Sequence, residues 1–297
     1  MTANDDSRSG IIVAGMHRSG TSLVTSVFGA CGYQMAPDQL PPEDDNPKGF
    51  FEDRKVHMLH RRWLESLEAG WDLSPRLREL RDQDLRLPAH LEAETQELVD
   101  YYRSVHPWVW KNPRATLFLE EWARRFPEAT FVICLRTPGA VVDSMLRRKS
   151  RLRIPSRRKL YRVRRLMRGL SLWRTYNLMA LHFAQRHLDR TVVLRIPADL
   201  DVLQRSSPTM VFEPGLLKRP RKRVAWPAAM ALRCQSLHWR LSRLAEPQRL
   251  AELLDAPRRS DEPAPREHGH VSLGGLIRIA ASIAITGALE AGYNLAF

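Results

Sequence analysis

The sequence has few cysteines and no motif that would pair them. The 297 residues include three, Cys31, Cys134 and Cys234, which are widely separated and form no Cys-x-x-Cys pair. An odd number at this spacing argues against both a disulfide framework and a zinc site. We therefore expect no metal, and we expect the reduced, buried thiols that are usual in a cytoplasmic protein.

Long apolar runs are also missing from the N-terminal end. Residues 1–9 are polar and lack the apolar segment of a secretory signal, so we expect a disordered tail there. At the other end, a proline-rich linker over 255–270 leads to an apolar C-terminal segment, 271–297. The uncharged core of that segment, residues 279–289, is shorter than the roughly 20 residues of a spanning helix. We favour a helix docked on the domain. An interfacial membrane helix is the second alternative, and a membrane-spanning helix is the third.

Acidic residues are absent from 147–168, a stretch that holds twelve basic ones and nearly all of the net charge of +14. It fits a solvated helix face or the edge of a groove for an anionic acceptor, such as a saccharide or a lipid-linked glycan. Nucleic acid is disfavoured, because no helix-turn-helix, zinc-finger or RNA-binding aromatic motif accompanies the charge. Peripheral membrane contact through 147–168 or 271–297 is a further alternative.

One stretch, Ile11 to Ser22, combines a short apolar run, a glycine-bounded polar loop and the start of a helical pattern. A strand, loop and helix in this order aim backbone amides at one spot and create a site for an anion. Gly15 and Gly20 are spaced as in nucleotide-binding G-x-x-x-x-G-K-[ST] loops, but Thr21 stands where that motif has lysine. The loop therefore predicts a phosphate cradle that is not built for ATP, with an ordinary strand-to-helix turn as the alternative.

The rest of the chain alternates apolar strand patterns with helical ones, which predicts an α/β fold with a parallel sheet flanked by helices. Further strands are expected at 108–110, 130–135 and 191–196. Helices are expected after Asp53, which is the candidate N-cap of the first, and at 88–104, 115–125, 138–148, 170–187 and 226–254. These elements form one domain over 10–254. Ligands of such folds bind beyond the carboxyl ends of the strands, where Arg18 and Arg136 are expected to lie.

Three stretches together resemble the sulfotransferase family, whose members use 3′-phosphoadenosine 5′-phosphosulfate (PAPS). The loop GMHRSGTS, residues 15–22, looks like the family's 5′-phosphosulfate loop. The segment LRTP, residues 135–138, with Val141 and Ser144, looks like its 3′-phosphate segment. A third stretch, Leu172 to Asn177 followed by a strand, is similar to the helix and strand that close many bacterial members.

The resemblance implies a P-loop-like nucleotide-binding (sulfotransferase) fold and transfer of a sulfonate group from PAPS to a hydroxyl or amine. The expected acceptor is a saccharide or glycoconjugate. It implies no metal. Arg18 would stand beside the transferring sulfonate, and Arg136 and Ser144 would hold the 3′-phosphate. The residues assigned to PAPS are His17, Arg18, Ser19, Gly20, Thr21, Ser22, Arg136 and Ser144.

The general base is not given by the resemblance in its usual form, because Lys111-Asn112-Pro113 lacks the histidine that follows this lysine in many members. We assign the role to Glu52, with Asp53 and His57 as alternatives. Lys111, Arg114 and Lys48 either steer the anionic donor or are plain surface charges. Two other functions remain open: a kinase-like nucleotide-dependent enzyme, and a basic module that binds polyanions or membranes through a degenerate nucleotide site.

Overall fold

The computed structural model describes residues 10–43, 49–71, 79, 85–147, 159–201, 228–245 and 249. The tail 1–9, the linker 255–270 and the apolar segment 271–297 lie outside the described residues, as does much of the basic stretch 147–168. Within the described part of the chain, no helix has the length and apolarity needed to cross a membrane.

The centre of the protein is a parallel sheet of four strands in the order β2-β1-β3-β4. The strands are β1 (Ile11–Ala14), β2 (Val109–Lys111), β3 (Thr130–Arg136) and β4 (Thr191–Ile196). All four strands were expected from their apolar runs, and β3 is buried at every position but its last. The parallel α/β architecture is thus confirmed. Because β2 and β3 flank β1 on opposite sides, the chain reverses its direction of progress across the sheet beside β1, the place where open α/β sheets bind ligands.

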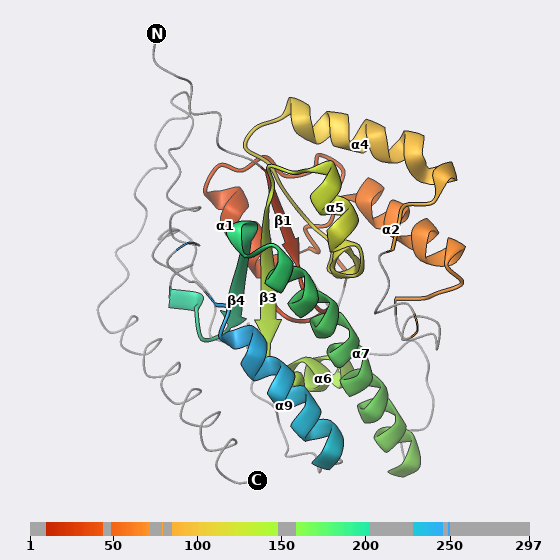
Figure 1. The fold of residues 1–297 in the computed structure, drawn as a ribbon, viewed down its shortest axis with the longest axis vertical. Helices are drawn as coiled ribbons and strands as arrows, with labels where there is room; N and C mark the ends of the chain where they lie inside the picture. Colours follow the sequence, from red (N-terminus) through yellow and green to blue (C-terminus); the bar gives the residue numbers. More distant parts are fainter. Residues whose placement is uncertain are drawn as a thin grey trace.

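Side chains alternate along the strands and so divide the core into two layers. On one face, Val13 and Val132 pack against α1 (Thr21–Ala30) through Val24, Val27 and Phe28. On the other face, Ile12 and Ile133 belong to a larger core that includes residues of α2 (Arg54–Ser66), α4 (Glu92–Ser104), α5 (Leu119–Arg125), α6 (Pro138–Arg147), α7 (Lys159–Arg186) and α9 (Ala228–Ser242). Figure 1 shows α7 and α9 running side by side, with α9 beginning near the ends of β3 and β4.

Helix boundaries differ from the expected ones at several places, of which three are the largest. Residues 113–125 form a 3-10 helix, Pro113–Leu117, and then α5. The two are separate because Phe118, at φ −126° and ψ 21°, departs from helical geometry. The helix expected to begin at 170 begins at Lys159, inside the basic stretch. Helix α9 ends at Ser242, whereas one helix through 254 was expected, and the chain then turns so that Ala245 bridges β4.

Candidate active site

The loop after β1 has the backbone of a cradle. Gly15 has φ +132°, and a Cβ there would lie 2.5 Å from the Cys134 carbonyl oxygen of β3, so only glycine fits. Its amide donates to Thr116 Oγ1 over 2.8 Å. Arg18 adopts the left-handed conformation at φ +71°, which costs energy for a residue with a side chain and is typical of functional loops.

The loop delivers its arginine to the helix that was expected to contribute the second half of the site. Arg18 Nε donates to Ser144 Oγ of α6 over 3.0 Å, across 126 residues of sequence. Arg136, at the end of β3, donates from NH1 to the Arg18 carbonyl oxygen over 3.1 Å. The structure therefore joins Arg18, Arg136 and Ser144 in one cluster at the carboxyl ends of β1 and β3.

Helix α7 supports this cluster from the larger core. Trp173 donates from Nε1 to the Arg136 carbonyl oxygen over 3.0 Å and so fixes the end of β3. Tyr176 donates to the Trp71 carbonyl oxygen over 3.2 Å. The His17 ring packs between them, with ring centroids 4.5 Å from Trp71 and 5.8 Å from Tyr176. Trp71 was not predicted, and no sequence pattern marks it.

The remaining loop residues have distinct surroundings. Ser19 is buried, and its amide and hydroxyl both donate to the Met16 carbonyl oxygen, so its side chain closes the loop rather than reaching outward. Gly20 is the N-cap of α1, and the first turn of that helix, as described by the structure, holds no acidic residue and receives no side-chain cap. Ser22 donates to the Phe50 carbonyl oxygen over 3.1 Å, which ties α1 to the 49–53 loop.

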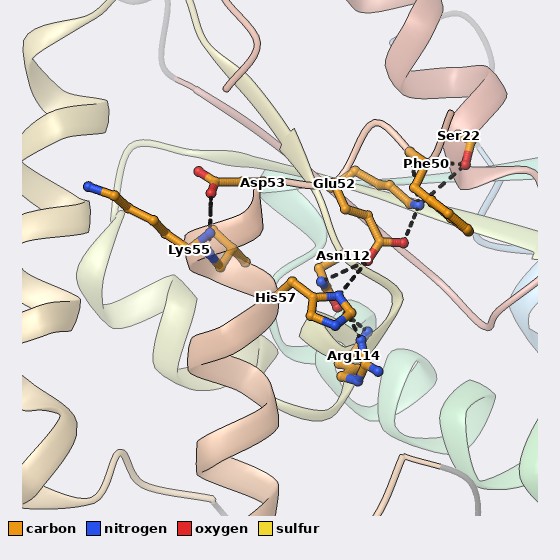
Figure 2. Close-up of polar contacts among 10 residues, drawn as sticks. Ser22, Phe50, Glu52, Asp53, Lys55, His57, Asn112 and Arg114 are labelled. Atoms are coloured by element: carbon orange, nitrogen blue, oxygen red, sulfur yellow. Dashed lines mark hydrogen bonds and ion pairs between the residues drawn. The ribbon is translucent and has the colours of Figure 1, made fainter. Parts of the chain in front are cut away.

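Glu52 lies in that loop, at the centre of a dense set of polar contacts (Figure 2). Its Oε1 accepts from Lys111 Nζ over 2.7 Å. Its Oε2 accepts from Asn112 Nδ2 over 3.1 Å and lies 3.2 Å from His57 Nδ1. Burial would by itself raise the pKa of this carboxyl, but the Lys111 ammonium and the hydrogen bonds from His57 and Lys111 lower the pKa to about 2. Glu52 is therefore ionised at neutral pH.

The two alternatives for the base differ sharply in their surroundings. Asp53 points away from Glu52 toward the start of α2 (Figure 2), where it accepts from the Lys55 amide over 2.6 Å and from the Tyr102 hydroxyl over 2.5 Å. This confirms Asp53 as the N-cap of α2. Its carboxylate oxygens are occupied by these structural hydrogen bonds. The His57 ring is partly exposed, and its Nδ1 lies within 3.2 Å of both Glu52 and the NH1 of Arg114.

The burial of Lys111 was not predicted from the sequence. The interpretation as a plain surface charge is wrong, because its side chain is 2% exposed and lies at the end of β2 on the face that α1 covers. A lysine at the end of the apolar run WVWK is the signal that could have marked it as buried. Arg114, by contrast, is partly buried beside His57. Lys48, another basic residue considered near the site, lies outside the described residues.

A comparison with protein-family models matches residues 10–197 to the sulfotransferase family. This match covers more than half of the chain. The chain belongs to the sulfotransferase family. No curated protein matches its sequence significantly.

Several solved structures share broad similarity with this sulfotransferase. The sulfotransferase STF1 from Mycobacterium tuberculosis H37Rv aligns over 79% of this chain and 76% of its own, at 14% identity and a TM-score of 0.40. STF9 from Mycobacterium avium aligns over 80% and 76%, at 13% identity and a TM-score of 0.42. The sulfotransferase domain of the Synechococcus PCC 7002 olefin synthase aligns over 94% of both chains, at 16% identity and a TM-score of 0.35.

Proposed function

We propose that this sulfotransferase transfers a sulfonate group from PAPS to a hydroxyl or amine acceptor, and that the acceptor is a saccharide or glycoconjugate. The observation that supports the donor most directly is the hydrogen bond from Arg18 to Ser144, because it unites the loop and the helix to which the two phosphate subsites are assigned. The Thr21 position, where an ATP-binding loop has lysine, argues against the kinase-like alternative.

The residues present fit a bisphosphorylated nucleotide. The Arg136 guanidinium contacts the backbone of Arg18, in the loop that leads into the N-terminus of α1, and the Arg18 guanidinium contacts the Ser144 hydroxyl. Guanidinium groups suit phosphate oxygens well. We assign the 3′-phosphate to Arg136 and Ser144. We assign the 5′-phosphosulfate to Arg18 and the segment from His17 to Ser22, in which Ser19 shapes the loop.

PAPS supplies an activated sulfonate: the acceptor oxygen bonds to sulfur, and the bond from sulfur to the 5′-phosphate oxygen breaks with its electron pair left on that oxygen. The protein's own part is electrostatic and positional, as in phosphoryl transfer. Arg18 stabilises negative charge that develops at the phosphosulfate. Glu52 takes the proton that the acceptor hydroxyl loses, and its ionised state at neutral pH is the one that can accept it.

The donor is tested by calorimetric titration of the wild-type protein with adenosine 3′,5′-bisphosphate. We expect a dissociation constant below about 100 μM, equivalent to a binding free energy of roughly −5.5 kcal/mol or stronger. The acceptor is tested by transfer of labelled sulfate from PAPS onto cell-envelope glycans, with small phenols as the competing class. Labelled phenols without labelled glycans would overturn the saccharide assignment, and absence of nucleotide binding would overturn the donor.

The base is tested by Glu52→Gln, which keeps the shape of the side chain and removes its charge. We expect turnover to fall by about 10²-fold or more, in line with general-base catalysis, while the affinity for adenosine 3′,5′-bisphosphate changes little. Glu120→Gln is a matched control, because Glu120 pairs with Arg186 and His187 at the far end of α7. Full activity in Glu52→Gln would move the base to His57.

A further inference from the structure

Lys111 joins the anion loop to the proposed base. Its Nζ donates to Glu52 Oε1 over 2.7 Å, to the Phe50 carbonyl oxygen over 2.9 Å and to Ser22 Oγ over 3.3 Å. An ammonium has three N–H donors, and these three oxygens match them. Lys111 thus holds together β2, the 49–53 loop and the first turn of α1.

Glu52 and an anion bound at Ser22 would both attract the Lys111 ammonium, which lies between them. Glu52 is a weak proton acceptor while the ammonium contacts it, because a carboxylate with a lowered pKa has little affinity for a proton. Ser22, on the other side of the ammonium, belongs to the segment assigned to the phosphosulfate. An anion placed at that segment competes with Glu52 for the same buried cation, where charges interact more strongly than in water.

We propose that Lys111 is a positioning residue that changes its partner during the reaction: it pairs with Glu52 in the free protein and turns toward the donor's anion when the donor binds at Ser22, which releases Glu52 to act as the base. The inference rests on the proposed function. Lysine suits this exchange because its charge sits on a flexible stem with rotatable donors. The sulfotransferase would then activate its base only when the donor is present.

The groups that face Glu52 and Lys111 define the expected change. Around Glu52 these are Lys111, His57, Asn112 and, at longer range, His17. Around Lys111 they are Glu52, the Cys134 thiol and the Arg114 guanidinium. Burial is the largest single influence on the pKa of this carboxyl, and it raises that pKa. When the ammonium moves away from Glu52, its charge and its hydrogen bond no longer oppose burial, so the pKa of Glu52 rises. Donor binding should therefore be accompanied by proton uptake at mildly acidic pH.

Calorimetry of adenosine 3′,5′-bisphosphate binding at pH 5.0, in two buffers of different ionisation enthalpy, measures this uptake. The control is the double variant Lys111→Met/Glu52→Gln, which removes both buried charges and so avoids leaving one unpaired. Its proton exchange comes from the nucleotide and the rest of the protein. We expect the wild type to take up about half a proton more per bound nucleotide than the double variant, and the excess to vanish at pH 7.5.

Equal uptake by wild type and double variant, with both binding the nucleotide, would overturn the partner exchange and leave the proposed function intact. Absence of binding by the wild type would instead remove the proposed function, and this inference with it. A second arm uses Lys111→Met: Glu52 should have a raised pKa before ligand is added. The acid limb of its profile of kcat/KM against pH should then shift upward, whereas a purely structural role would lower kcat/KM without moving that limb.

Discussion

Arg18 Nε and Ser144 Oγ lie 3.0 Å apart, although 126 residues of sequence separate them. The contact exists because β1 and β3 are neighbours in register, which places the loop after one strand beside the helix after the other. It makes the two assigned phosphate subsites parts of one polar cluster. The charge of Arg18 is therefore available to both.

Arg136→Ala is expected to weaken binding of adenosine 3′,5′-bisphosphate by roughly tenfold to a hundredfold, the value of one charge-assisted hydrogen bond. The substitution also removes the contact from Arg136 NH1 to the Arg18 carbonyl oxygen. Titration calorimetry measures the change. Arg186→Ala is the matched control, because that arginine is exposed and pairs with Glu120. Equal affinities for the two variants would contradict the assignment of Arg136 to the nucleotide.

Gly15→Ala is expected to lower the free energy of unfolding by more than about 2 kcal/mol, because a Cβ at φ +132° would meet the Cys134 carbonyl oxygen at 2.5 Å. Gly32→Ala is the control that separates the cost of a positive φ from the cost of a steric clash. Gly32 has φ +93° but no atom within 4 Å of the added Cβ, so we expect a cost of about 1 kcal/mol there. Urea denaturation of both variants gives the comparison, and equal losses would show that Gly15 needs no extra room.

Asp53→Ala should destabilise the protein while leaving kcat nearly unchanged. It removes the N-cap of α2, worth about 1 kcal/mol, and leaves the buried Tyr102 hydroxyl without its acceptor. A double-mutant cycle with Tyr102→Phe measures the coupling between the two side chains. We expect the double variant to be more stable than the sum of the single losses predicts. A large drop in kcat at full stability would instead restore Asp53 as a candidate base.

We expect His60 to make the stability of the protein sensitive to acid. Its side chain is fully buried, accepts from Trp122 Nε1 over 2.8 Å, and has a pKa lowered to about 3, mainly by burial and also by the Arg114 charge. The unfolded chain binds a proton on this histidine near pH 6.5 and the folded chain does not, so stability falls as pH drops from about 6.5 toward 3.

His60→Gln keeps an acceptor for Trp122 and removes this titration. Urea midpoints of the wild type and the variant at pH 7, 5 and 4 should therefore converge as the pH falls, even where the variant is less stable at pH 7. Parallel curves would show that His60 does not set the acid sensitivity.

The sequence was sufficient for the strands, for the first loop and for the cap at Asp53, because each depends on residues close together in the chain. The apolar run of β3 and the glycines around Arg18 determine local backbone structure whatever surrounds them. Helix limits were less predictable. The backbone conformation of Phe118 divides one predicted helix into two. Helix α7 begins inside the basic stretch, where no apolar periodicity predicts a helix.

The contacts between the segments that follow β1, β2 and β3 depend on the tertiary structure. Strand order makes the carboxyl ends of β1, β2 and β3 direct neighbours, and no local pattern specifies strand order. The sequence placed Lys111 at the end of a strand, but only packing against α1 shows that its charge is buried between Ser22 and Glu52. The carboxylate of Glu52 is identified from sequence as a candidate base, whereas its ionisation depends on a cation supplied from 59 residues away.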